Sequence, residues 1–189
     1  MYNPVAFKSH LSPQLLLEAI SKESDNTFVQ GIRSDPFAFL RWFLLYLKND
    51  PSLRKRDGDG TPSTIIDTCC RGMVRIQQST KNDTPIISYI PSLFLSLPLP
   101  SAPIFPDVVQ KQIQVPEVTI HSLLQRFNGS TKILNPDGTY RYLKLVKLPP
   151  YLLIHIARFT RTEFFIEKNP THVRFPLRGL NMKEWIVNN

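Results

Sequence analysis

Cysteine is nearly absent from this sequence, and its scarcity removes most thiol and metal chemistry. The two cysteines among the 189 residues are neighbours, Cys69 and Cys70. They fall in a segment with strand-like patterning, where adjacent side chains point to opposite faces of a sheet. Such a pair is poorly placed to form one disulfide or to hold one zinc ion, which needs a larger set of spaced ligands. We therefore expect no metal, no cofactor and a reducing compartment.

Glycine and long apolar runs are scarce as well. Seven glycines stand against 17 prolines. Because proline breaks helices and stiffens connections, this composition predicts extended segments rather than long helices. The apolar runs stay below the length of about 20 residues that spans a bilayer, and no signal-peptide pattern opens the sequence. We expect no association with membranes.

Acidic residues are the minority charge. The sequence has 15 Asp and Glu against 23 Lys and Arg, a formal net charge of +8. A basic balance favours polyanions, so nucleic acid or a ribonucleoprotein is one class of partner. The alternative is a merely soluble basic surface, because the cations are scattered. Their densest cluster is Arg54-Lys55-Arg56, in a polar loop that could also act as a short nuclear-import signal.

Capping residues followed by proline predict two helix starts, at Ser12-Pro13 and Asp35-Pro36. We expect the second helix, which ends before Asp50-Pro51, to be buried along most of its inner face. Its apolar stripe comprises Phe37, Phe39, Leu40, Trp42, Phe43, Leu44 and Leu47. A short helix is predicted from Thr119 to Phe127, with Leu123, Leu124 and Phe127 pointing inward and Gly129 near its end.

Most of the remaining sequence has the patterning of strands, so the fold class is α+β. We expect turns near Arg71-Gly72 and at Asn135–Gly138, and a stiff proline-rich connection over 97–106. The predicted strand segments are 65–66, 73–76, 88–97, 140–147, 151–159 and 164–167.

The histidines, acids and aromatic pairs form no pattern that indicates catalysis. None of the histidines, His10, His121, His155 and His172, has a partner at metal-ligand spacing. We interpret His155 as a packed or hydrogen-bonded strand residue rather than a base. Phe37 with Phe39, and Phe164 with Phe165, are interpreted as core rather than as stacking platforms for bases. The sequence therefore predicts no catalytic, cofactor-binding or metal-ligating residue.

The segment 148–182 resembles the palm region of the ubiquitin-specific proteases (peptidase C19). The elements that carry this resemblance are Leu148-Pro149, Arg158-Phe159, Lys168, Thr171, Val173 and Phe175-Pro176. The resemblance implies a papain-like fold with thumb, fingers and palm. In this chain it assigns 1–50 to the thumb, 62–118 to fingers-like strands and 119–189 to palm strands.

Two further runs are similar to the non-catalytic, tri-snRNP-associated (Sad1-like) splicing branch of that family. They are DPFAFLRWFL at 35–44 and FFIEKNPT at 164–171. Ala38 stands where active members carry an acidic residue. This resemblance implies a nuclear, catalytically inactive scaffold whose partners are tri-snRNP proteins and small nuclear RNAs, with ubiquitin as a further candidate partner.

The thiols do not match the nucleophile of the family, because Cys69 and Cys70 follow the Asp35 helix instead of preceding it. The chain contains neither the Cys box nor the His box, and we expect it to be a fold truncated at both ends. One alternative is a cysteine deubiquitinase whose boxes lie outside the chain. Another is a ubiquitin-binding module without activity.

Eight residues are expected to support the fold. Arg158, at the end of a core strand, should pair with a backbone carbonyl or a carboxylate. The eight are Phe39, Trp42, Phe43, Leu148, Arg158, Phe159, Phe175 and Pro176.

Overall fold

The computed structural model describes residues 12–56, 60, 62–79, 84–101, 115–161 and 166–186. The chain divides into two compact units, Met1–Pro51 and Ser52–Asn189. His10, Phe164, Phe165 and residues 102–106 of the proline-rich connection lie outside the described residues. No helix in the described ranges is long and apolar enough to cross a membrane.

The first unit contains two helices, α1 (Gln14–Glu23) and α2 (Pro36–Asn49). The predicted cap of α2 is confirmed, because the Asp35 carboxylate accepts from the Phe37 amide at 2.9 Å and Pro36 takes the first helical position. The predicted cap of α1 is wrong: Pro13 is the N-cap of this helix, and the Ser12 hydroxyl accepts from the Gln14 amide at 3.3 Å from outside it. The apolar stripe of α2 is less covered than expected, because no residue of this helix is fully buried. Its rings contact one another and Phe28; the Phe39 and Phe43 rings stack with their centroids 5.8 Å apart.

The centre of the second unit is a four-stranded antiparallel sheet in the order β4-β3-β8-β7. Its strands are β3 (Gly72–Ser79), β4 (Ile86–Ser92), β7 (Ile133–Leu134) and β8 (Tyr140–Lys147). The predicted turn joins β7 to β8: the Asn135 amide donates to the Thr139 carbonyl at 2.9 Å, and Gly138 takes the left-handed conformation at φ 79°. The predicted strand 140–147 is thereby confirmed.

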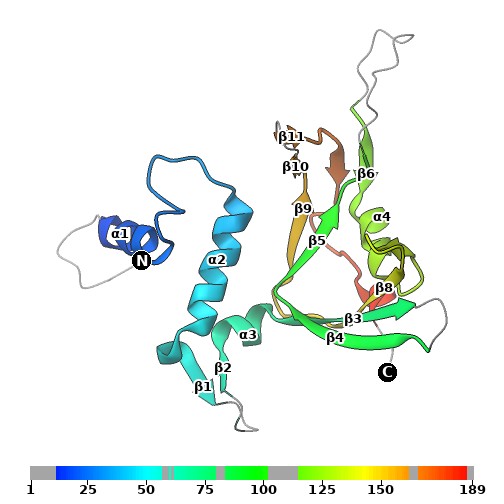
Figure 1. Cartoon of the computed structure of the whole chain (residues 1–189), viewed down its shortest axis with the longest axis horizontal. Coiled ribbons are helices and arrows are strands. Elements are labelled where there is room, and N and C mark those ends of the chain that lie inside the picture. The colour runs from blue at the N-terminus through cyan, green and yellow to red at the C-terminus, as the bar shows by residue number, and fades with distance from the viewer. Residues whose placement is uncertain are drawn as a thin grey trace. The chain divides into compact units, whose positions relative to one another are not determined.

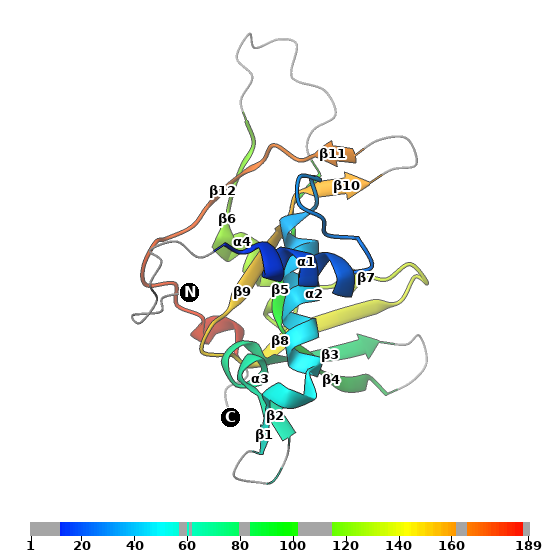
Figure 2. The ribbon, with the colours of Figure 1, turned by 90° about the vertical axis from the view of Figure 1, so that its left-hand side faces the viewer.

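Two parallel strand pairs join distant parts of the sequence. Strand β5 (Phe94–Pro98) pairs with β9 (Leu153–Ala157), and β6 (Glu117–Thr119) pairs with β12 (His172–Arg174). Strands β10 (Phe159–Arg161) and β11 (Ile166–Lys168) form an antiparallel pair at the same end as β6 (Figures 1 and 2). The predicted strand 151–159 is thus interrupted at Arg158.

The core of the second unit lies between these sheets and helix α4 (Ile120–Leu124), which continues into the 3-10 turn η2 (Gln125–Phe127). In Figure 1, α4 occupies the angle between the β5–β9 pair and the four-stranded sheet. The predicted inward residues of this helix are confirmed as buried. The core comprises Val74, Leu95, Leu97, Ile120, Leu123, Leu124, Phe127, Leu143, Leu145, Val173 and Trp185, the last in the 3-10 turn η3 (Lys183–Trp185).

The predicted strand at 65–66 is wrong, because this segment starts helix α3 (Ile65–Cys70). Thr64 and Asp67 form a capping box, in which each side chain accepts from the other's backbone amide. The preceding residues pair as β1 (Arg54–Arg56) and β2 (Pro62–Thr64), after the 3-10 turn η1 (Pro51–Leu53). The expected turn at Arg71-Gly72 is therefore the junction between α3 and β3.

Three of the residues expected to support the fold are largely exposed. Phe159 is 62% exposed and Phe175 is 59% exposed, and Pro176 is also exposed. Leu148 packs against the core as expected. In Phe159 and Phe175 the aromatic ring therefore stabilises the described part of the second unit very little.

Candidate functional site

The cysteine thiols lie at the carboxyl end of α3 and not on a strand. Cys69 and Cys70 are both partly buried and unbridged. The Cys69 carbonyl accepts from the Tyr151 amide at 2.9 Å, which ties α3 to the segment after Pro149-Pro150. The local role of this helix end is thus a backbone contact.

The acidity of the Cys70 thiol is unfavourable for nucleophilic chemistry. Burial, and then the neighbouring Cys69, raise the pKa of Cys70 above its ordinary value. The reactive form of cysteine is the thiolate, and cysteine nucleophiles have lowered pKa values next to cations or helix amino termini. At neutral pH, Cys70 therefore holds less thiolate than a free cysteine.

The described histidines occupy three separate structural positions. His121 lies in α4, with its ring centroid 5.7 Å from that of buried Trp185. His172 lies in β12, where its amide donates to the Pro116 carbonyl at 2.7 Å. His155 lies in β9, and its Nδ1 atom is 3.2 Å from the Ser96 hydroxyl of the paired strand β5. The interpretation of His155 as a hydrogen-bonded strand residue is confirmed.

Acidic and metal-ligating side chains are dispersed. Across the residues that the structure describes, no group of three or more His, Cys, Asp or Glu side chains could hold a metal ion. The prediction that the chain has no catalytic or metal-binding residue stays a prediction.

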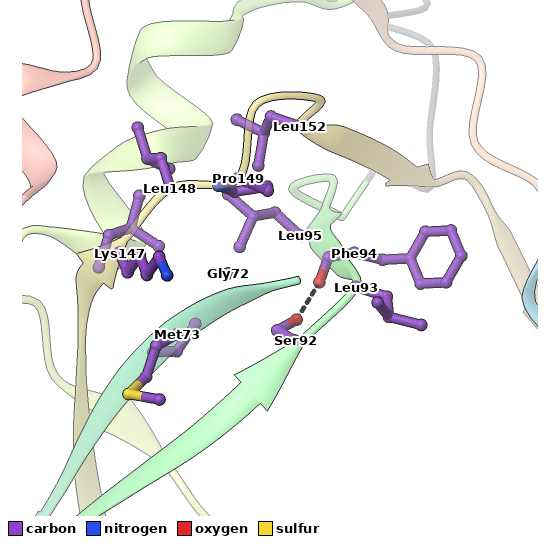
Figure 3. A pocket seen from close by; sticks show the side chains of 12 residues that line it. Gly72, Met73, Ser92, Leu93, Phe94, Leu95, Lys147, Leu148, Pro149 and Leu152 are labelled. Atoms are coloured by element: carbon purple, nitrogen blue, oxygen red, sulfur yellow. Dashed lines mark hydrogen bonds between the residues drawn. The ribbon is translucent and has the colours of Figure 1, made fainter. Parts of the chain in front are cut away.

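A small apolar cavity marks where β3, β5 and the β8–β9 connection meet (Figure 3). Its volume is about 10 Å³, room for no more than one water molecule. Gly72 lies so close to this connection that a Cβ atom there would be 2.8 Å from the Lys147 carbonyl oxygen and 3.1 Å from Pro149 Cδ. The Leu148-Pro149 element thus fixes the crossing of the chain over β3, and the cavity is a packing junction.

Arg158 holds the other motif segment in place. Its guanidinium donates to the Thr171 carbonyl at 2.5 Å and to the Asn169 carbonyl at 3.4 Å. Asn169 returns an amide hydrogen bond to the Arg158 carbonyl at 2.7 Å. Thr171 is buried, so without Arg158 its carbonyl would have no water molecule to accept a hydrogen bond from. The predicted pairing of Arg158 with backbone carbonyls is confirmed, and its role is structural.

Positive charge gathers between β8 and η2, where no motif in the sequence indicated it. Strand β8 carries Arg141, whose Nε atom is buried and, within the described residues, has no hydrogen-bond partner. Burial, and then the nearby Arg141, lower the pKa of Arg126 in η2. These cations were scattered in the sequence, and only the fold brings them together.

Comparison with known proteins identifies the family of the chain. The family model "Ubiquitin carboxyl-terminal hydrolase" matches residues 3–189. Ubiquitin carboxyl-terminal hydrolase 39 of Mus musculus is 34% identical over 98% of this chain and 36% of its own length. The "Probable mRNA-splicing protein ubp10" of Schizosaccharomyces pombe is 33% identical over 98% of this chain and 39% of its own length. The chain thus spans well under half the length of these relatives.

Solved structures have the same fold. A crystal structure of an essential yeast splicing factor superposes with a TM-score of 0.59 at 25% identity, covering 92% of this chain and 38% of that one. The SAGA DUB module bound to ubiquitin aldehyde superposes with a TM-score of 0.60 at 18% identity, covering 91% of this chain and 37% of that one. The α+β, ubiquitin-specific-protease fold expected from the sequence is confirmed.

Proposed function

The chain belongs to the ubiquitin carboxyl-terminal hydrolase family, and from this premise we propose that it is a catalytically inactive scaffold of the spliceosomal tri-snRNP that acts in pre-mRNA splicing. The observation that carries the proposal is its similarity, over nearly its whole length, to relatives named as splicing proteins. These include ubp10 and the Pre-mRNA-splicing factor SAD1 of Saccharomyces cerevisiae, which is 25% identical over 95% of this chain and 41% of its own length.

Similarity to relatives named as splicing proteins supports the inactive part of the proposal. Cys70 is a poor nucleophile, because burial raises the pKa of its thiol. Residues 1–50 form the thumb, 62–118 the fingers and 119–189 the palm. The partners are tri-snRNP proteins and small nuclear RNAs, and the protein acts in the nucleus. The exposed Arg54–Arg56 strand suits an import signal.

Affinity purification of the tagged protein from nuclear extract tests this proposal. We expect the U4, U5 and U6 small nuclear RNAs to co-purify with the protein. A matched purification of the tag alone sets the background. Recovery of the protein without these RNAs would overturn the splicing assignment.

Family membership favours, as the second candidate, a cysteine deubiquitinase whose Cys and His boxes lie outside this chain. Hydrolysis of ubiquitin-aminomethylcoumarin by the tagged protein purified from nuclear extract separates the two functions. We expect no release of the fluorophore. Release above the background of the tag alone would make the protein an enzyme. Retention of the chain on immobilised ubiquitin without hydrolysis would identify ubiquitin as a ligand only.

A further inference from the structure

The four-stranded sheet is unusual in its charge. Its strands contain four basic residues and no Asp or Glu: Arg75, Arg141, Lys144 and Lys147. The ion pairs that the structure gives for the second unit, Arg71 with Asp67 and Arg174 with Glu117, involve none of these four. The positive charge of the sheet is therefore not neutralised by carboxylates within the described residues.

The strand register separates the two faces of this sheet. One face packs into the core through Val74, Ile76, Leu143 and Leu145. On the opposite face, Arg75 aligns with Tyr89 of β4 and Lys144 of β8, and the next row aligns Ile87, Gln77 and Tyr142. Tyr140 follows on β8, opposite Ser79. We name the outer sheet face as Arg75, Gln77, Ser79, Ile87, Tyr89, Tyr140, Tyr142 and Lys144.

Aromatic rings and cations alternate on the outer sheet face, close enough together for one ligand to contact several of them. Tyr89 is 56% exposed and Tyr140 is 43% exposed, while Arg75 and Lys144 are half-buried. The Lys132 ammonium lies 5.6 Å from the centroid of the Tyr140 ring. Paired strands lie about 4.8 Å apart, and same-face neighbours on one strand lie about 6.8 Å apart. Neighbouring side chains of this face therefore lie one ring-width from each other.

We infer that the outer sheet face binds single-stranded RNA. An antiparallel sheet with exposed rings on which bases stack, and with cations that follow the phosphates, is the recurring design of single-strand platforms. Tyr89 and Tyr140 stack on bases, and Arg75 and Lys144 contact phosphates. An acidic protein can pack on the same rings and cations, so it is the alternative that the experiment below separates from RNA. The inference rests on the proposed function, because it assigns a surface to the RNA partner.

The electrostatics of the outer sheet face come from two cations, Arg75 and Lys144. The ion pairs that the structure gives for the described residues of the second unit include neither of them. An arriving phosphate backbone would pair with both cations and release its own counterions. Arg141 is not part of this face, because it alternates with Leu143 and Leu145 on the core side of β8.

Fluorescence anisotropy of a labelled oligouridylate with the purified full chain, recorded across a salt series, tests the inference. We expect Tyr89→Ala and Tyr140→Ala each to weaken binding about tenfold, the loss of one stacked base. Tyr89→Phe, which keeps a ring, should bind as wild type. Arg75→Gln and Lys144→Gln should each lower the slope of log K against log salt by about 0.7.

Matched controls lie elsewhere on the second unit. Tyr151→Ala removes a tyrosine that is 66% exposed, and Lys168→Gln and Arg178→Gln remove exposed charges. These variants should bind the oligonucleotide as wild type does. Equal losses in the control and face variants, or no binding at all, would overturn the inference. A third outcome is that the chain binds an acidic protein but no oligonucleotide, and that the face variants lose this protein binding. That outcome would overturn the RNA inference in favour of a protein partner.

The two proposals fail separately. The binding assay uses only the purified chain, so its failure leaves recovery of U4, U5 and U6 from extract unaffected. Oligonucleotide binding together with no recovery of those RNAs would overturn the splicing assignment alone.

Discussion

Residues 52–189 enclose a core from which solvent is excluded, whereas the helices of residues 1–51 leave their apolar side chains partly open. Every apolar core residue belongs to the second unit, and the described part of the first unit buries only Ser24 to a comparable degree. The first unit also has a hollow of about 160 Å³ lined by Leu17, Ile20, Phe28 and Phe39, among others. An apolar stripe alone therefore does not predict a closed core, which also needs a second layer.

The largest expected effect is in the closed core. Trp185 is fully buried, so Trp185→Ala should lower the free energy of unfolding by about 3–5 kcal/mol. Urea denaturation followed by circular dichroism measures this loss. The conservative Trp185→Phe should cost much less. If Trp185→Ala lowered the free energy of unfolding by less than Trp42→Ala does, the second unit would not have the more tightly packed core.

The second prediction asks whether polar contacts also hold the second unit together. Arg158→Leu removes two charged hydrogen bonds and leaves the buried Thr171 carbonyl unpaired, so it should cost about 2–3 kcal/mol. The matched change Arg174→Leu removes an exposed ion pair with Glu117 and should cost less than about 1 kcal/mol. Equal melting temperatures for the wild type and Arg158→Leu would refute the structural role of this arginine.

A smaller effect is expected in the first unit. Trp42 is only half-buried among rings, so Trp42→Ala should cost about 1 kcal/mol, from reduced area burial and lost ring contacts. The two tryptophans lie one in each unit. Each single Trp→Phe variant leaves one tryptophan as the fluorescent reporter. Acrylamide should quench the fluorescence of Trp42, measured in Trp185→Phe, more strongly than that of Trp185, measured in Trp42→Phe. Equal quenching would mean that the stripe of α2 is closed in solution.

The smallest expected effect concerns Cys70. Because its pKa is raised, the thiolate forms at higher pH, and alkylation by iodoacetamide should begin at higher pH than for a free thiol. A Cys69→Ala background isolates this thiol and removes the lesser cause of the shift. Rapid alkylation at neutral pH would contradict the assigned environment of Cys70.

Local signals allowed the short helix 119–127, the turn at 135–138 and the strand 140–147 to be predicted from the sequence. Helix α3 was missed although Thr64 and Asp67 carry the spacing of a capping box, because the β-branched residues beside them favoured a strand. The outer sheet face could not be predicted. Arg75 meets Tyr89 and Lys144 only through the register of three strands, which depends on contacts distant in sequence.

The parallel pairing of β5 with β9 has a consequence for synthesis on the ribosome. The paired residues Ser96 and His155 are 59 positions apart, so β5 emerges long before its partner exists. At about 5–20 residues per second, this interval lasts roughly 3–12 s. Throughout that time, Leu95 and Leu97, which are buried in the folded protein, have no partner strand and stay exposed. We therefore expect the nascent chain to bind chaperones.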